Sequence, residues 1–130
     1  MNCAVRYYSR SGNTKTVAVA IAEEIGVKAI SIDSAHAALK ERVDVLFLGG
    51  ALYVYGLDKN MKEYINTIDP SKVGKVVLFS TASMSQHALD LMRKGLEAKG
   101  ISVERETFFI KGKQASGHMR EAAEFAKKFV

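Results

Sequence analysis

Residues 9–14, Ser-Arg-Ser-Gly-Asn-Thr, are the part of this sequence best suited to binding an anion. They follow the apolar residues 3–8 and precede a segment with helical periodicity. A loop that runs into a helix N-terminus offers unpaired backbone N–H groups and the positive end of the helix dipole, which together suit a phosphate. Gly12 allows a tight turn close to the anion. Further hydrogen-bond donors are the side chains of Ser9, Ser11, Asn13 and Thr14.

Three better-known phosphate motifs do not account for this loop. It lacks both the GxxxxGK[ST] spacing of a Walker loop and the GxGxxG spacing of a dinucleotide fingerprint. A tyrosine phosphatase of low molecular weight needs Cys-x5-Arg, but Ser9 stands where the arginine would follow Cys3. Phosphate binding therefore stays open beside a second interpretation, in which the same hydroxyl-rich residues only cap the helix.

Apolar periodicity predicts regularly alternating strands and helices around this loop. The expected strands are residues 3–8, 28–32, 43–50, 75–80 and 102–110. The expected helices are residues 14–25, 34–42, 61–68, 85–99 and 118–129, the last with Met119 on its inner side. Parallel neighbours need crossover connections, so this order predicts an α/β fold, a three-layer doubly wound sheet of five parallel strands. Residues 1–130 are expected to form a single domain.

The predicted topology gathers three polar segments at one edge. In doubly wound sheets the functional crevice lies beyond the carboxyl ends of the strands. The segments that follow the first, third and fourth strands are residues 9–14, 49–60 and 80–87. We expect these three segments to converge.

The stretch Tyr-Tyr-Ser-Arg-Ser-Gly-Asn-Thr resembles the FMN-phosphate loop of the flavodoxins, (S/T)-x-(S/T)-G-x-T after the first strand. Element order, chain length and loop positions are similar to that family over essentially the whole chain. The resemblance implies strand order 2-1-3-4-5, non-covalent FMN and electron transfer. It assigns the FMN phosphate to Ser9, Arg10, Ser11, Gly12, Asn13 and Thr14.

The second segment has chemistry that suits a flavin ring. A flat apolar heterocycle needs an aromatic or apolar wall, and two tyrosines stand just past a strand expected to be buried. The alternative is that these tyrosines pack on the next helix against Met61 and Tyr64. The resemblance places this segment beside the ring. It aligns Gly56 with a glycine whose peptide flips to accept a hydrogen bond from N5 of the reduced flavin. The residues concerned are Ala51, Leu52, Tyr53, Val54, Tyr55 and Gly56.

The third segment departs from the family. The other side of the ring is assigned to Thr81, Ala82, Ser83 and Met84. Flavodoxins commonly have an aromatic residue here that stacks on the outer face, but residues 80–87 contain no tyrosine, tryptophan or phenylalanine. Met84 or His87 takes that place, or the outer face is open to a substrate. For His87 we favour a surface position at the start of a helix.

The net charge of +5, from 19 Lys+Arg and 14 Asp+Glu, is a second departure, because flavodoxins are typically acidic. The basic residues are scattered, so we expect a solvated surface and no nucleic-acid site. No apolar run approaches the ~20 residues that span a bilayer. The single cysteine, Cys3, is expected to be a small buried hydrophobe, and the expected compartment is the cytoplasm. Arg6, within an expected strand, needs a partner or a path to solvent.

These observations predict an FMN-binding electron-transfer protein, by default a monomer, whose redox partner proteins present an acidic docking face. Two alternatives stay open. One is a small FMN-dependent reductase of a quinone or a porphyrinogen-like substrate, and we favour the electron carrier over such an oxidoreductase. The other is a binding or signalling module of this fold without flavin. No spacing of histidine, cysteine and carboxylate side chains indicates a metal site or a catalytic residue.

Overall fold

The computed structural model describes residues 1–50, 52–53, 56–82 and 87–130. The main sheet contains β1 (Cys3–Tyr7), β2 (Ala29–Ser31), β3 (Val43–Gly50), β6 (Val73–Ala82) and β7 (Phe108–Lys111). The helices are α1 (Asn13–Ile25), α2 (Lys59–Thr67), α3 (His87–Glu97) and α4 (Met119–Lys127). The 3-10 turns η1 (Pro70–Lys72) and η2 (Gly112–His118) precede β6 and α4, and β4 (Leu52–Tyr53) pairs antiparallel with β5 (Gly56–Leu57).

The five strands of the main sheet are all parallel, in the order β2-β1-β3-β6-β7. Leaving out the short β4–β5 pair, this is 2-1-3-4-5, so the predicted doubly wound topology is confirmed. The central strand β3 is buried along nearly its whole length, because helices cover both faces of the sheet. Its apolar sequence, VDVLFLGG, matches that environment.

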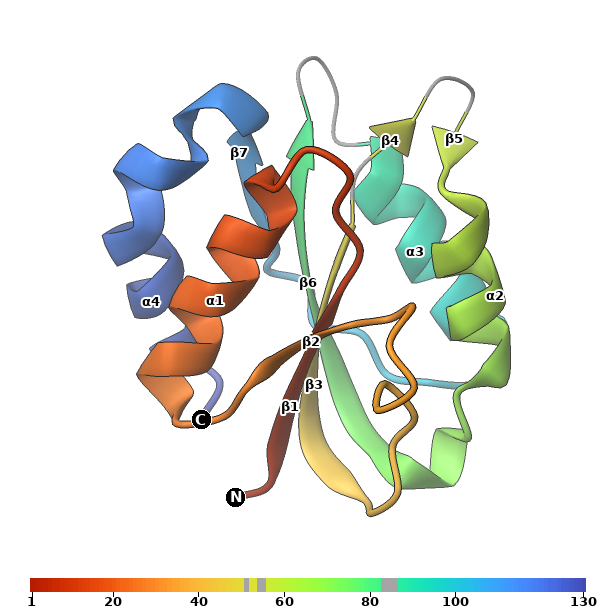
Figure 1. The fold of residues 1–130 in the computed structure, drawn as a ribbon. Helices are drawn as coiled ribbons and strands as arrows, with labels where there is room; N and C mark the ends of the chain where they lie inside the picture. Colours follow the sequence, from red (N-terminus) through yellow and green to blue (C-terminus); the bar gives the residue numbers. More distant parts are fainter. Residues whose placement is uncertain (51, 54–55, 83–86) are drawn as a thin grey trace.

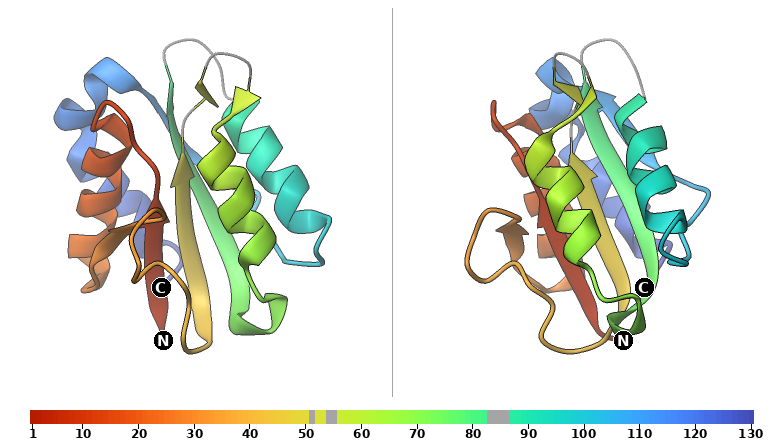
Figure 2. Two further views of the ribbon diagram at one scale, coloured as in Figure 1. Left: turned by 45° about the vertical axis from the view of Figure 1, so that its right-hand side comes forward. Right: turned by 90° about the vertical axis from the view of Figure 1, so that its right-hand side faces the viewer.

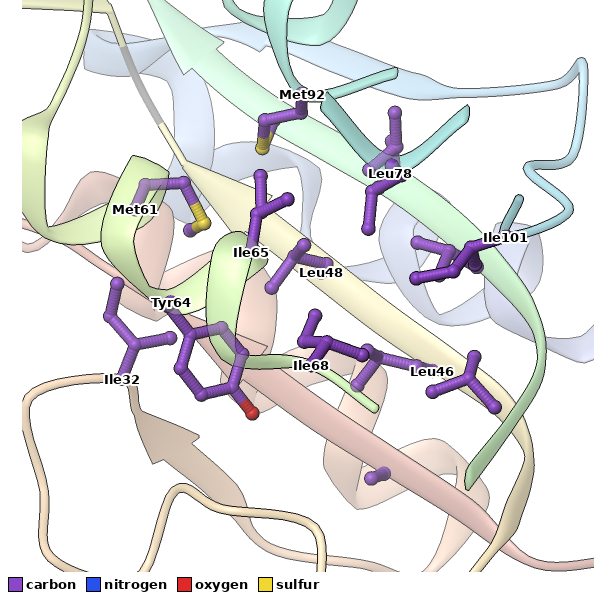
Figure 3. Packing of buried hydrophobic residues seen from close by; sticks show 14 of the residues in the cluster. Ile32, Leu46, Leu48, Met61, Tyr64, Ile65, Ile68, Leu78, Met92 and Ile101 are labelled. Carbon is purple, nitrogen blue, oxygen red and sulfur yellow. The ribbon is translucent and has the colours of Figure 1, made fainter. Parts of the chain in front are cut away.

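Helices lie in two layers on the two faces of the sheet (Figures 1 and 2). On one face α1 packs beside α4, and on the other α2 packs beside α3. Figure 3 shows Met61 and Ile65 of α2 and Met92 of α3 lying over Leu48 and Leu78 of the sheet. These contacts fix the positions of α2 and α3 on this face of the sheet.

Residues 34–42 do not form the predicted helix. Ser34 N–H and Ala37 N–H donate to carbonyls three residues earlier, which makes turns that do not continue. The Ala37 carbonyl accepts instead from Arg6 Nε, at 2.8 Å, and from the Tyr64 hydroxyl, at 2.7 Å. The side chains of Arg6, in β1, and Tyr64, in α2, therefore take the place of the backbone N–H that would bond this carbonyl in a helix. Apolar periodicity gives no sign of such long-range hydrogen bonds.

The last strand is shorter than the predicted 102–110. Val103 makes only an isolated bridge to Val76, and regular pairing begins at Phe108. The guanidinium of Arg93 donates to the carbonyls of residues 103, 104 and 105, so these groups bond a side chain rather than a neighbouring strand.

Two side chains are more exposed than the sequence indicated. Met119 is the first residue of α4 and is 36% exposed, so its predicted inward position is wrong. Cys3 is only partly buried, because it is the first residue of β1 and lies at the amino end of that strand. No helix among the described residues is long and apolar enough to span a bilayer.

Candidate functional site

The carboxyl end of β1 leads through a short turn into α1, as predicted. Gly12 stands at the helix N-cap with φ +93°, a backbone conformation that favours glycine. The turn is closed by Gly12 N–H, which donates to Ser9 Oγ at 2.9 Å. The first turn of α1 contains no acidic residue, and no side chain of the described residues caps it. An anion at this helix N-terminus would therefore meet the dipole without a competing carboxylate.

A hydrogen bond between two threonines joins this turn to the end of β6. Thr14 Oγ1 and Thr81 Oγ1 are 2.6 Å apart, and the two residues are 1% and 3% exposed. Either hydroxyl can be the donor, so one of the two protons is not used by this bond. The first and third polar segments therefore converge at the carboxyl edge of the sheet, as the topology predicted.

An ion pair joins the same turn to the start of α2. Arg10 Nη2 lies 2.7 Å from Asp58 Oδ2, with the Arg10 side chain 56% exposed and that of Asp58 2% exposed. The other oxygen of Asp58 accepts the Asn60 N–H at 2.8 Å and caps α2. The sequence analysis did not identify Asp58 as a site residue. An aspartate just before a predicted helix is an ordinary N-cap signal, and Asp58 lies in the second polar segment, so its position could have been noted.

Replacing Asp58 separates the two roles of this carboxylate. Asp58→Asn keeps an N-cap acceptor but removes the charge, and should lower the free energy of unfolding by less than about 1 kcal/mol because Arg10 is more than half exposed. Asp58→Ala also removes the cap and should cost about 1 kcal/mol more than Asp58→Asn. Urea unfolding of the flavin-free protein measures both. Equal stability of the two variants would mean that the cap contributes nothing.

Among the described residues, one buried side-chain polar atom near this edge has no hydrogen-bond partner. Ser80 is 0% exposed, and its hydroxyl makes no hydrogen bond with any described residue. It pairs in register with Gly50 of β3 and precedes Thr81. Because side chains alternate along a strand, Ser80 shares the sheet face of Leu78, under α2 and α3, and Thr81 shares that of Phe79, under α1. The features of this edge that fit a phosphate are therefore the uncapped start of α1 and the Thr14–Thr81 pair.

The remaining predicted residues occupy both sides of this edge. Ser9, Arg10, Ser11 and Gly12 form the turn, and Asn13 and Thr14 begin α1. Leu52, Tyr53 and Gly56 belong to the β4–β5 pair, and Ala82 ends β6. His87 is the exposed first residue of α3. Five predicted residues lie outside the described part of the chain: Ala51, Val54, Tyr55, Ser83 and Met84. Flavin contact by any of these residues stays a prediction.

Comparison with solved structures identifies the same fold in flavin proteins. A flavodoxin from the domain Archaea is 24% identical, with TM-score 0.74 and 99% of both chains covered. Oxidised Flavodoxin 2 from Bacillus cereus is 18% identical, with TM-score 0.66, over 96% of this chain and 99% of that one. An apo NADH:FMN oxidoreductase is 17% identical, with TM-score 0.68, over 100% of this chain and 91% of that one.

At these identities the solved structures establish the fold alone. No curated protein sequence matches the chain. The family model described as a flavodoxin domain, in contrast, matches residues 4–126, which include the turn at Gly12, the Thr14–Thr81 contact and, apart from Cys3, all residues of the five main-sheet strands. With the parallel sheet order and the convergent polar edge, this match shows that the chain belongs to the flavodoxin family.

Proposed function

We propose that this protein binds FMN non-covalently and transfers electrons between redox partners. The observation that carries the proposal is the turn at residues 9–12, which delivers an uncapped helix N-terminus, free of acidic side chains in its first turn, to the edge where Thr14 meets Thr81. Family membership supports a flavin as the ligand. A phosphate at this helix selects the phosphorylated form, FMN.

The chain's own residues bind and orient. Backbone N–H groups at the start of α1 and the side chains of residues 9–14 hold the phosphate, and the segments 51–56 and 81–84 flank the ring. Asp58 fixes the position of Arg10 beside the phosphate turn. When bound, FMN would supply the redox chemistry, while the protein supplies binding, orientation and electrostatics.

An FMN-dependent reductase is the second candidate, and one observation favours it. Residues 80–87 contain no tyrosine, tryptophan or phenylalanine to stack on the outer face of the ring, and an uncovered face would admit a quinone or a porphyrinogen-like molecule. Direct reoxidation of the reduced protein by a quinone, at a rate that saturates with quinone concentration, would favour the reductase. Rapid electron exchange with a protein partner and no saturable quinone reaction supports the electron carrier. We place either activity in the cytoplasm.

The basic surface should tune the reduction potential of the bound flavin. Positive charge near the ring favours the added electron, by the same electrostatics that shifts a pKa. Arg10 and Lys59 are the basic residues of the phosphate turn and of the start of α2, and Lys59 is 88% exposed. Arg10→Gln and Lys59→Glu should each lower the potential by on the order of 10 mV at low salt, and less at high salt.

Redox titration at two salt concentrations tests this tuning. Lys59→Glu puts an acidic residue in the first turn of α2, which favours the helix, and replaces the exposed Lys59–Glu63 ion pair by a like-charge pair, which opposes it. The two small effects on helix stability largely cancel. Lys28→Glu, in the turn before β2, is the matched control, and it should leave the potential unchanged. Equal potentials in all four proteins at low salt would contradict electrostatic tuning.

A basic surface around the site would also suit redox partners that present an acidic docking face.

A further inference from the structure

A cavity lies away from the carboxyl edge of the sheet. It measures about 460 Å³ and is lined by Cys3, Ala4 and Arg6 of β1, by residues near the start of β2, and by residues 36–43. Figure 2 shows the chain between β2 and β3 returning past the β2 edge of the sheet, and residues of this returning chain line the cavity. Its lining includes no residue of the predicted flavin site. The volume falls in the range of small-molecule sites.

One wall of this cavity contains a buried guanidinium without a counter-charge. Arg6 is 8% exposed and donates to two backbone carbonyls, from Nε to Ala37 and from Nη1 to Val5. No ion pair joins Arg6 to a carboxylate among the described residues. A buried charge that is hydrogen-bonded but not paired still bears part of its desolvation cost.

The polar neighbours of Arg6 do not supply a negative charge. Burial raises the pKa of the Tyr64 phenol, and the nearby Arg6 offsets part of this rise. The protonated hydroxyl donates a hydrogen bond to the Ala37 carbonyl. Burial also raises the pKa of the Cys3 thiol. Both groups are therefore neutral at physiological pH.

The rim of the cavity adds to the positive charge. Lys28 and Lys40 are exposed and line it, as does His36, and Glu41 is the single carboxylate of the lining. Asp44, just beyond the lining, is paired with Arg42 at 2.7 Å. Arg6, Lys28 and Lys40 outnumber the single carboxylate of Glu41, so the cavity concentrates positive potential in a recess with partly apolar walls.

The wall formed by residues 36–43 is fixed by hydrogen bonds before any ligand binds. Ala37 is held by Arg6 and Tyr64, and the Lys72 ammonium donates to the carbonyls of Leu39 and Lys40 at 3.3 and 3.1 Å. Such preorganisation reduces the ordering cost of binding.

We propose that this cavity binds a small organic anion that carries phosphate or carboxylate groups, with Arg6 at its wall and Lys28 and Lys40 at its rim. A planar guanidinium matches the geometry of either group, and the two lysines supply longer-range attraction. The site is separate from the flavin site and does not depend on it. It would give the protein a metabolite-binding function beside electron transfer.

The test is a titration of the full chain with inorganic phosphate and, separately, with citrate, followed through backbone amide resonances by NMR. We expect saturable shifts of residues 28–41 with at least one of the two probes. The double variant Lys28→Glu/Lys40→Glu should weaken this binding at least tenfold. The control, Lys62→Glu/Lys94→Glu, changes the net charge equally at exposed positions on α2 and α3, and should change the affinity less than twofold.

Arg6→Met removes the buried charge while filling similar volume, and should abolish the shifts of residues 28–41. If Arg6→Met does not fold, the two lysine double variants still decide the question. The proposal is overturned if neither probe saturates below about 10 mM, if the shifts are confined to residues 9–14, or if both double variants bind alike. It is also overturned if Arg6→Met folds and binds as the wild type does, which would leave Arg6 as an anchor for Ala37 alone.

Discussion

FMN should bind this protein at least about a hundredfold more tightly than riboflavin, which lacks only the phosphate. The start of α1 presents backbone donors at a helix end that no described side chain caps. A hydrogen bond to a charged group contributes about 1.5–3 kcal/mol, so the loss of two such bonds gives the expected ratio. FAD should bind less tightly than FMN, because no segment of the chain is assigned to an adenosine group. Fluorescence quenching of each flavin measures the affinities.

A pair of threonine variants localises this preference. Thr14→Ala removes a buried hydroxyl from the phosphate turn and should weaken FMN about tenfold while changing riboflavin little. Thr16→Ala is the matched control, because the Thr16 hydroxyl donates to the Gly12 carbonyl instead and is not assigned to the ligand. Equal affinity of wild type for FMN and riboflavin would contradict the phosphate assignment, as would equal effects of the two variants.

The second large effect concerns stability. Gly49→Ala should lower the free energy of unfolding by about 3 kcal/mol, because overpacking a closed core forces neighbours out of their rotamers. A Cβ at Gly49 would lie 2.0 Å from Cε2 of Phe79, which is fully buried in the adjacent strand. Because that ring is fully buried, either it or the sheet must shift.

Gly95→Ala is the matched control for this substitution. Gly95 lies within α3, and a Cβ there would be 3.4 Å from Ile65 Cγ2, close to ordinary contact. Helix propensity then makes alanine slightly stabilising. Urea unfolding of both variants is the measurement. If Gly49→Ala were as stable as Gly95→Ala, the close packing of β3 on β6 described here would be wrong.

The sheet could be predicted because its signals are local. VDVLFLGG over residues 43–50 can be buried on both faces only in a covered parallel strand, and the helix stop at Gly26 was equally clear. The failures at residues 34–42 and 102–107 have a common cause. In each, an arginine from outside the segment donates to carbonyls that the predicted element needed, Arg6 in the first and Arg93 in the second.

The candidate site was predicted to the level of segments rather than contacts. Parallel topology brings residues 9–14 and 80–87 to one edge, and the Thr14–Thr81 hydrogen bond confirms that convergence. The pairing of Arg10 with Asp58 could not be foreseen, because it joins positions 48 residues apart whose relation depends on how α2 meets the sheet. The position of Ser80 opposite Gly50 likewise depends on strand register, which the sequence does not display.

The central claim is that the edge defined by Gly12, Thr14 and Thr81 binds one FMN. The most direct measurement is the visible absorption spectrum of the full chain after addition of excess FMN and removal of unbound flavin by gel filtration. The account predicts a yellow protein that retains one FMN per chain, with flavin bands altered from those of free FMN. A protein that leaves the column colourless, while remaining folded, would contradict it and favour a module of this fold without flavin.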